Sequence, residues 1–394
     1  MPFEHGSAAA TMASSDLPRA IGARRLSLVR ILEVAPFAAP IDEQRTELGG
    51  AQIILQDLSR GLAARGHIVT LVAARGSHVD GVELLDLGID SARMQRADLG
   101  LTTGERSDER AEREAFAKVR AWVDANASEI DVIHAHAYDA PAFASLVGAP
   151  RPVAHTLHLP PLDEAVMRAA RSAKDATLVT VSNANAAAWR KAGVPVGTVV
   201  PNGIDVTSIP FSRDRGDHLL YAGRISPEKG VAAAIEIAER TRRGILIVGS
   251  IYDQAYFAKR VAPRVRAVPD AAAPARVRGA IYIGPRSREE VYVHMGHAAA
   301  LVLPVEWDEP FGLVAVESLA TGTPVVAYRR GGLADILDYT SGELVQPSDL
   351  DAFVAAVPKA IDKDPLECRR RAERFTLEAM VTGYETVLAG LVHS

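Results

Sequence analysis

A chain of 394 residues is too long for one hydrophobic core, so we expect two domains of about 150–200 residues each. The formal net charge of -5 disfavours a nucleic-acid partner, because a phosphate backbone calls for a basic protein surface. The single cysteine, Cys368, excludes an internal disulfide and a cysteine-based metal site, which favours the reducing cytoplasm.

The sequence contains no run of about 18 consecutive apolar residues, so we expect no transmembrane segment. Residues 1–27 include a patch of small residues but lack the basic lead-in and leucine-rich stretch of a secretory signal. We expect them to form a flexible extension outside the fold.

From Leu28 onward, apolar strand-like segments alternate with segments of helical periodicity. A first strand is predicted at residues 29–34. A helix predicted at residues 51–65 ends at Gly66, in the position of a C-terminal cap. The further strands predicted in this half are at residues 68–73, 82–87, 132–134, 153–157, 177–181 and 198–200.

A charged helix is predicted over residues 104–126. Its basic and acidic side chains nearly balance and are spaced to pair across one helical turn. This pattern favours a solvated helix face over a basic helix that lies on a membrane surface.

The second half begins after the turn signal Asn202-Gly203 and a polar linker at residues 210–217. A capping box is predicted at Ser287 and Glu290. The predicted strands are at residues 219–222, 245–248, 280–283, 300–305 and 325–327, and the predicted helices are at residues 231–242, 289–297, 311–320 and 352–361. Strands separated by helices imply parallel sheets, so we expect two open α/β domains with a cleft between them.

The segment 306–317 holds the densest group of candidate ligand-binding residues. We expect a helix to open near Pro310, whose missing N–H suits the first turn, and Gly312 to let a ligand approach the backbone. The helix N-terminus would suit a diphosphate. Glu309 and Glu317 could hold two ends of one ligand, although a capping acid and a solvent-facing glutamate explain the spacing equally well.

Two further segments could contact phosphate groups. A strand ends at Gly223-Arg224, and Lys229 follows in a short loop, at the edge where ligands bind in open α/β sheets. The glycines Gly49-Gly50 precede the first helix and could bring backbone N–H groups to a phosphate. A pair of surface cations and a plain flexible loop are the alternatives for these two segments.

Histidines cluster in the first half at His134, His136, His155 and His158. No metal-binding motif accompanies them, so we interpret them as polar contacts at strand ends, with His158 placed to face the cleft. The pattern Asp349-Leu350-Asp351 is interpreted as the N-terminal cap of a helix, not as a metal site.

Together these segments resemble the family 4 glycosyltransferases, a retaining group with the GT-B fold. Glu309 and Glu317 resemble the E-x7-E signature of that family, and Gly223-Arg224 with Lys229-Gly230 resembles its clamp on the donor diphosphate. The other similar segments are residues 49–50, 156–158, 201–205, 322–327 and a C-terminal helix at 375–391. At residues 159–161 the chain has Leu-Pro-Pro where related sequences often carry glycine, so the geometry on the acceptor side can differ.

The resemblance implies an α/β protein of GT-B type, with two Rossmann-like parallel-sheet domains facing a cleft. Residues 28–205 would bind the acceptor, residues 206–375 the nucleotide sugar, and residues 376–394 would form a helix that crosses back to the first domain.

The same resemblance implies roles for individual residues. Glu317 would hold the ribose hydroxyls, Glu309 the hydroxyls of the transferred sugar, and His158 the sugar near its 6-position. The implied catalytic residues are His158, Arg224, Lys229 and Glu309. The implied donor-binding residues are Gly49, Gly50, Arg224, Lys229, Glu309, Phe311, Gly312, Leu313 and Glu317.

The predicted function is a retaining transfer of a hexose from a nucleoside diphosphate sugar, UDP in preference to GDP, to a small soluble acceptor in the cytoplasm. We expect no cofactor beyond this co-substrate and no metal, since two cations and a helix end already balance the charge. The alternatives are a non-catalytic protein that binds nucleotide sugars on this scaffold, and a sugar-nucleotide epimerase that needs no acceptor.

Overall fold

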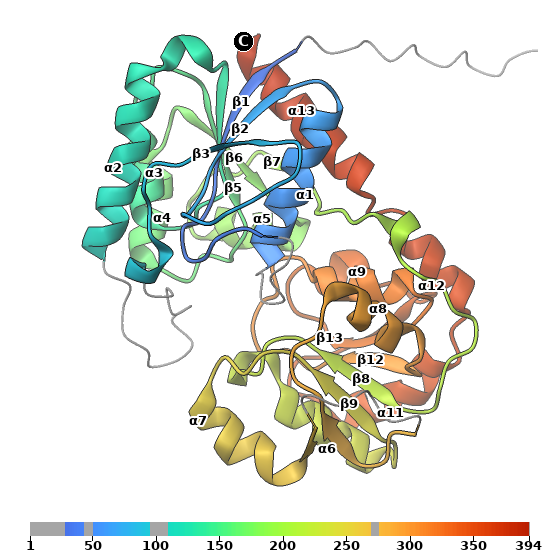
Figure 1. The fold of residues 1–394 in the computed structure, drawn as a ribbon. Helices are drawn as coiled ribbons and strands as arrows, with labels where there is room; N and C mark the ends of the chain where they lie inside the picture. Colours follow the sequence, from blue (N-terminus) through green and yellow to red (C-terminus); the bar gives the residue numbers. More distant parts are fainter. Residues whose placement is uncertain (1–27, 43–49, 95–108, 269–275, 394) are drawn as a thin grey trace, which may run out of the picture.

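The computed structural model describes residues 28–42, 50–94, 109–268 and 276–393, so the expected extension at residues 1–27 lies outside it. Two α/β units follow one another along the chain, coloured from blue to green and from yellow-green to red in Figure 1. The predicted fold class, two domains built on parallel sheets, is confirmed.

The strands described in the first unit form one parallel sheet in the order β3-β2-β1-β4-β5-β6-β7. They are β1 Arg30–Val34, β2 Ile68–Val72, β3 Glu83–Leu85, β4 Val132–Ala135, β5 Val153–Leu157, β6 Ala176–Thr180 and β7 Thr198–Val199. The α-helices of this unit are α1 Gly50–Ala64, α2 Glu109–Ala125, α3 Ala140–Leu146, α4 Glu164–Ser172 and α5 Asn183–Lys191.

The second unit contains a parallel sheet whose described strands run in the order β10-β11-β9-β8-β12-β13-β14. They are β8 Leu219–Ala222, β9 Ile245–Val248, β10 Arg266–Ala267, β11 Ala280–Tyr282, β12 Ala300–Leu303, β13 Val325–Tyr328 and β14 Gly342–Val345. The α-helices that follow the first unit are α6 Val231–Arg240, α7 Gln254–Tyr256, α8 Arg288–Gly296, α9 Leu313–Ala320, α10 Leu333–Ile336, α11 Leu350–Ile361, α12 Pro365–Ala372 and α13 Leu377–Val392.

The central strands are apolar along their whole length because helices cover both faces of each sheet. All four residues of β12 are buried, and so are all four residues of β13. Burying one such Leu, Ile or Val side chain contributes about 1.5–3 kcal/mol, so these strands form the inflexible base on which the loops at their ends are placed.

Each sheet has one position where the direction of strand addition reverses. In the first sheet it lies between the neighbours β1 and β4, and in the second between β8 and β12. At such a position the loops leaving the two strands diverge to opposite faces and open a crevice for ligands. Candidate residues follow β8, β12 and β4, so they lie at the sheet edges where α/β folds bind their ligands.

The predicted starting residue of one helix is wrong. We expected the helix to open near Pro310, but α9 begins at Leu313, and Gly312 precedes it with a left-handed φ of 104°. The preceding loop is fixed by contacts from far along the chain, since the N–H of Gly332 donates to the carbonyl of Glu309 at 2.7 Å. This long-range bond keeps residues 309–312 out of the helix.

The other predicted features correspond closely to the structure. The charged helix is α2, although residues 104–108 of the predicted range lie outside the described residues. The capping box at Ser287 and Glu290 is present at the start of α8, and Asp349 caps α11 as predicted. In the described part of the chain, no helix is both long enough and apolar enough to cross a membrane.

The chain crosses between the two units twice, and the crossings lie side by side. Ile204 donates its N–H to the carbonyl of Phe375 at 3.0 Å and accepts from the N–H of Leu377 at 2.8 Å. Gly203 permits this approach, because a Cβ atom on it would lie 2.1 Å from the carbonyl oxygen of Thr376. The two crossings therefore form one hydrogen-bonded hinge.

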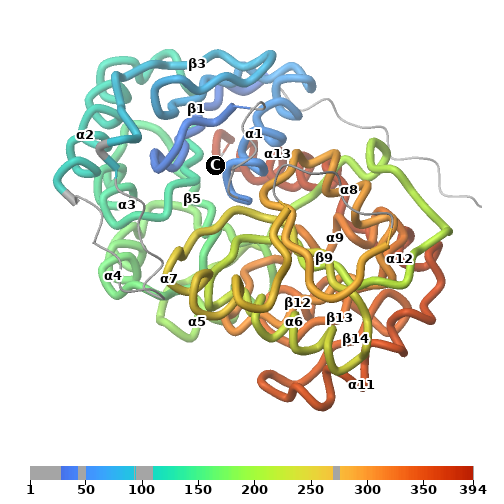
Figure 2. The backbone as a smooth tube through the Cα atoms, turned by 60° about the horizontal axis from the view of Figure 1, so that its bottom comes forward, coloured from blue at the N-terminus to red at the C-terminus, as the bar shows by residue number. Residues whose placement is uncertain are grey.

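After the second crossing, α13 packs against α1 of the first unit, and the two helices lie together in both Figure 1 and Figure 2. Its buried residues Met380, Val381, Tyr384 and Leu388 join a core formed with α1 and the strands β1, β2, β4, β5 and β6. Gly61 of α1 faces Val381 directly, so the small glycine lets the helices approach closely. The last helix of the chain thus completes the core of the first unit.

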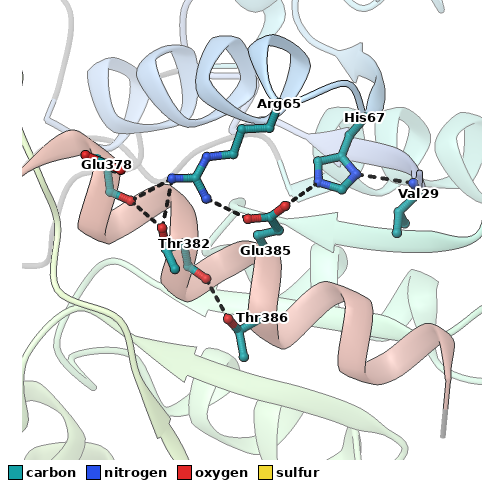
Figure 3. Close-up of polar contacts among 7 residues, drawn as sticks. All are labelled: Val29, Arg65, His67, Glu378, Thr382, Glu385 and Thr386. Carbon is teal, nitrogen blue, oxygen red and sulfur yellow. Dashed lines mark hydrogen bonds and ion pairs between the residues drawn. The ribbon is translucent and has the colours of Figure 1, made fainter. Parts of the chain in front are cut away.

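A polar cluster anchors α13 from the outside (Figure 3). The carboxylate of Glu385 accepts from Arg65 at 2.6 Å and lies 3.0 Å from Nε2 of His67, whose Nδ1 accepts from the N–H of Val29 at 3.2 Å. Burial alone would raise the pKa of Glu385, but the bonds from His67 and Arg65 outweigh burial and lower it.

Replacing Glu385 by Gln removes this anchor and should destabilise the protein by about 2 kcal/mol near neutral pH, the usual contribution of hydrogen bonds to a charged group. Because the pKa of Glu385 is lowered in the folded state, its contribution exists above the unfolded pKa of about 4.3 and is lost as the pH falls. Urea unfolding at pH 7 and pH 4 measures both effects.

The matched control is Glu378→Gln on the same helix. Glu378 meets Arg65 only through its backbone carbonyl, so the same loss of charge there should change stability far less. Equal losses in the two variants would contradict the assigned role of Glu385.

Candidate active site

The candidate residues of the second unit meet where its strand order reverses. Arg224 and Lys229 follow β8, and Glu309 follows β12, which pairs directly with β8. The two loops are tied together, because the N–H of Glu306 donates to the carbonyl of Glu228 at 2.8 Å. This bond places the loop that carries Lys229 beside the loop that carries Glu309.

Lys229 forms the centre of a compact polar group. Its Nζ lies 2.6 Å from Oε2 of Glu309 and 4.5 Å from the ring centre of Trp307, whose Nε1 donates to the same oxygen at 2.9 Å. The glycine that follows, Gly230, has a φ of 74°, and a Cβ there would lie 1.9 Å from the carbonyl of Pro304. Glu309 is thus held by a cation and an indole N–H, the types of donor that a sugar hydroxyl could replace.

Arg224 is oriented by the loops around it. Its guanidinium carbon lies 4.6 Å from the ring centre of Tyr252, and its backbone carbonyl accepts from the hydroxyl of the buried Tyr221 at 2.8 Å. Its side chain is about one-third exposed, at 36%, so the cation remains accessible to a ligand.

The loop between Glu309 and α9 also contacts the first unit. The hydroxyl of Ser182 donates to the carbonyl of Pro310 at 2.5 Å. Asp335, on α10 of the second unit, accepts from the N–H of Asn183 at 2.6 Å and so caps the N-terminus of α5 in the first unit. These bonds fix the position of the loop relative to both units.

Glu317 is buried and paired with a residue that the sequence analysis did not identify. Its Oε1 accepts from Nε of Arg288 at 3.0 Å and from the hydroxyl of Tyr292 at 3.3 Å. Arg288 also reaches Asp57 of α1 at 3.4 Å, so the same guanidinium joins the two units. Burial raises the pKa of Glu317, and Arg288 opposes this rise.

Three buried histidines of the first unit, His134, His136 and His158, form a connected group with Glu33, while the ring nitrogens of His155 make no hydrogen bond to any described residue. Nδ1 of His134 and Nε2 of His136 lie 3.1 Å and 2.9 Å from Oε2 of Glu33, and Nδ1 of His136 lies 2.8 Å from Nε2 of His158. The far nitrogen of His134 lies 2.8 Å from the hydroxyl of Thr156.

The pKa values in this group follow from burial and from the pairing. Burial alone would raise the pKa of Glu33, but His134 and His136 outweigh it and lower the pKa to about 2. Burial lowers the pKa of His136 to about 4, with a further contribution from His134. Burial also lowers the pKa of His158 well below its ordinary value.

The same three side chains could hold a metal ion. The ligand atoms of Glu33, His134 and His136 all lie within 4.8 Å of one another, and all three residues are buried. The hydrogen-bond network already accounts for their close approach, and the absence of a metal remains a prediction.

His158 is held by contacts to its neighbours in the chain. The side-chain amide of Asn185 donates to the carbonyl of Leu157 at 2.9 Å, and the indole of Trp189 donates to the carbonyl of Leu159 at 2.9 Å. The N–H of Asn185 in turn donates to Ser182, which bonds to Pro310. A short chain of bonds therefore connects the backbone around His158 to the loop that carries Glu309.

The structure brings Lys229 into contact with Glu309, whereas Glu317 pairs with Arg288 and His158 with His136. Gly49 lies outside the described residues, and Gly50 is an exposed residue that opens α1. Phe311 is buried in the core of the second unit, while Leu313, at the start of α9, packs against the cores of both units. The roles of these residues toward a ligand remain predictions.

Several residues near the site were missed by the sequence analysis. Tyr138 and Asp139 follow β4, at the switch point of the first sheet. Burial raises the pKa of Asp139 to about 7, and Glu112 and Asp163 add to this. Burial also raises the pKa of Tyr138, whose surroundings include Arg224 and Tyr252 of the second unit. Asp139 is thus a titratable group near neutral pH on the side of the first unit that approaches Arg224.

Two family models match consecutive parts of the chain. The model described as Glycosyltransferase Family 4 matches residues 48–208, and the model described as Glycosyl transferases group 1 matches residues 209–376. The two matches meet between residues 208 and 209 and together cover both units.

Curated relatives are similar in sequence over different lengths. A glycogen synthase of Mycobacterium tuberculosis is 36% identical over 186 residues, which cover 44% of this chain and 42% of that protein, so this match spans less than half of the relative. A D-inositol 3-phosphate glycosyltransferase of Nocardiopsis dassonvillei is 26% identical over 374 residues, covering 84% of this chain and 86% of the relative.

Solved structures show the same fold over nearly the whole chain. The sucrose-phosphate synthase of Thermosynechococcus elongatus is 18% identical, with a TM-score of 0.69 over 92% of this chain and 99% of that chain. Anabaena HepE, solved in complex with UDP-glucose, is 19% identical, with a TM-score of 0.68 over 92% and 100%. A glycosyltransferase involved in avilamycin A biosynthesis is 20% identical, with a TM-score of 0.64 over 93% and 98%. These likenesses confirm the expected GT-B fold.

Replacing Arg288 by Met should leave the buried carboxylate of Glu317 without its cation. Breaking such a pair from one side typically costs about 3 kcal/mol, so we expect a loss of that size in urea unfolding at pH 7. Without Arg288 the pKa of Glu317 should rise further, so the loss should shrink as the pH falls and the carboxyl group is protonated.

The double variant Arg288→Met with Glu317→Gln should recover most of the lost stability, because the buried carboxylate that lost its cation is replaced by a neutral amide. Arg240→Met is the matched control, since Arg240 pairs with the well-exposed Asp351 and should contribute little. A double variant as unstable as the single one would contradict the pairing argument.

Proposed function

This chain belongs to the group 1 glycosyltransferases of family 4, and on that basis we propose that it transfers a sugar from a nucleoside diphosphate sugar to an acceptor hydroxyl. The observation that carries the proposal is the pairing of Lys229 with Glu309 at the switch point of the second sheet, with the accessible cation of Arg224 on the same loop as Lys229. Cations there suit a diphosphate, and a carboxylate suits sugar hydroxyls.

Donor binding would exchange the present partners of the site. The diphosphate would take Lys229 and Arg224, with the N-terminus of α9 at Gly312 and Leu313 adding backbone N–H groups. Glu309, released from Lys229, would accept from hydroxyls of the transferred sugar. Glu317 would accept from the ribose hydroxyls, a role that requires Arg288 to move or to share the carboxylate.

We propose, from the resemblance to a retaining family, that the transfer retains the anomeric configuration. The bond from C1 to the diphosphate oxygen breaks while the acceptor oxygen bonds to C1 from the same face, and the acceptor proton passes to the departing phosphate. Lys229 and Arg224 would stabilise the charge that develops on the phosphate, the step in which a positioned cation contributes most. His158 would contact the sugar from the first unit.

We assign UDP as the preferred nucleotide and a hexose as the transferred sugar. HepE, which shares the fold, was solved with UDP-glucose, and this supports the assignment. We propose that no metal takes part, because two cations and a helix N-terminus already meet the charge of the diphosphate.

The acceptor is proposed to be a small molecule bound against the first unit. The basic and acidic side chains of α2 nearly balance, a surface suited to water and not to an anionic membrane. One relative is a D-inositol 3-phosphate glycosyltransferase, a name that gives that protein a small acceptor. A cytoplasmic location agrees with the single cysteine in the sequence.

A thermal-shift panel of UDP, GDP, ADP and dTDP, each with EDTA and with magnesium, tests donor binding. We expect UDP to stabilise the protein most and equally in both conditions, since a ligand at 100 times its Kd adds about 2.7 kcal/mol. Stabilisation only with magnesium would contradict the metal-free proposal. Stabilisation by no nucleotide would favour a decayed site.

Replacing Lys229 by Ala should lower kcat with the preferred donor by about 10²–10³-fold, because loss of one such contact costs about 3–4 kcal/mol of transition-state stabilisation. Lys359→Ala, at an exposed position on α11, is the control and should retain full turnover. Comparable rates in the two variants would contradict the assignment.

The anomeric configuration of the product, read by NMR, tests retention.

A further inference from the structure

The buried histidine group has an inner and an outer end. His134 and His136 are fully buried and His155 is 1% exposed, whereas His158 is 6% exposed and lies at the carboxyl end of β5. His158 is thus the most exposed of the four, and His134 and His136 are connected to the surface only through it.

Glu33 fixes the positions of the protons in this group. An ionised carboxylate only accepts hydrogen bonds, so Nδ1 of His134 and Nε2 of His136 must both carry hydrogen where they face it, at 3.1 Å and 2.9 Å. Nδ1 of His134 and Nε2 of His136 lie 3.2 Å apart. Because both are donors to the same oxygen of Glu33, this contact is not itself a hydrogen bond.

The proton on Nε2 of His136 determines the state of His158. A neutral imidazole carries one hydrogen, so Nδ1 of His136 is an acceptor, and burial favours this neutral form. Nε2 of His158, 2.8 Å away, must then be the donor of the bond between the two rings. This leaves Nδ1 of His158 as a bare nitrogen, and it makes no hydrogen bond to any residue that the structure describes.

We propose that Glu33, acting through His136, holds His158 as the tautomer protonated on Nε2 and bare on Nδ1, so that His158 accepts a hydrogen bond from the substrate. Glu33 and His136 are positioning residues, since they act only through His158. The identity of the substrate group, a sugar hydroxyl, rests on the proposed function, whereas the tautomer is a property of the protein alone.

The bare nitrogen has a consequence for substrate choice. A hydroxyl can donate to it, but a carboxylate at the same place would set two acceptors against each other. His158 should therefore favour a sugar that presents a hydroxyl there over the corresponding uronic acid.

The test is NMR on protein labelled with ¹⁵N-histidine, in which two-bond correlations distinguish a protonated from a bare ring nitrogen. In the wild-type protein we expect His158, assigned by its loss in a His158→Asn variant, to be protonated on Nε2 and bare on Nδ1. The opposite pattern, or a mixture of the two tautomers, would overturn the proposal without any variant.

Two variants test the chain of causes. Glu33→Gln removes the charge and leaves one acceptor oxygen for two donors, and His136→Phe removes the direct partner, so His158 should become a mixture of tautomers in both. An unchanged His158 in Glu33→Gln would remove Glu33 from the arrangement. The control is His155→Phe on β5. The imidazole of His155 stacks on the ring of Phe143, with centroids 4.4 Å apart, and is not bonded to His158, so His158 should keep its wild-type pattern.

Metal analysis of the purified wild-type protein completes the test. An ion on Glu33, His134 and His136 would occupy Nε2 of His136 and place a hydrogen on its Nδ1, which reverses the tautomer of His158. One equivalent of bound zinc would therefore overturn the proposal, and a metal-free protein supports it.

Activity measurements separate this proposal from the proposed function. If the wild-type protein transfers sugar, Glu33→Gln should lower kcat at least tenfold and leave the thermal shift by UDP unchanged. The expected tautomer in a protein that transfers no sugar would refute the proposed function alone. Transfer by a protein with hydrogen on Nδ1 of His158 would refute this inference alone.

Discussion

The chain passes between its two units twice, and the backbones of the two crossings are hydrogen-bonded to each other at Ile204. The units meet again where Arg288 reaches Asp57 and where Ser182 bonds to Pro310. The hydrogen-bonded crossings and these contacts together set how the two sheets face each other.

The charges at the site neutralise one another in the structure described here. Lys229 pairs with Glu309, and Arg288 pairs with Glu317, in places where an unpaired charge would cost several kcal/mol. Under the proposed function, donor entry would therefore exchange these partners and would not fill an empty charged space. Such an exchange can be selective, because only a ligand with an anion and hydroxyls in the right places can replace both pairs at once.

The central buried strands and the longer helices were predicted from the sequence, because buried parallel strands and capped helices leave local patterns. The short helices α3, α4, α5, α10 and α12 and the edge strands β10 and β14 were not predicted. The start of α9 was missed because the loop before it is held by Gly332, distant in sequence, and local signals favoured Pro310. Arg288 was missed because it lies next to a capping box and so resembles an exposed residue of a first turn.

Glu33 gave a signal that was not used, since a charged residue within an apolar strand predicts a buried partner. Its connection to the histidines required the pairing of β1 with β4, which sets Glu33 opposite His134 and which no local pattern contains.

The docking of α13 on the first unit also bears on how the protein is made. The first unit is discontinuous in sequence, and the residues that complete its core, including Tyr384 and Leu388, leave the ribosome after the whole second unit. During synthesis the first unit must wait with an open apolar surface beside α1, where a chaperone could bind. For the same reason, exchanging domains between relatives at a single junction would separate a domain from part of its own core. A working chimera must carry α13 together with residues 28–205.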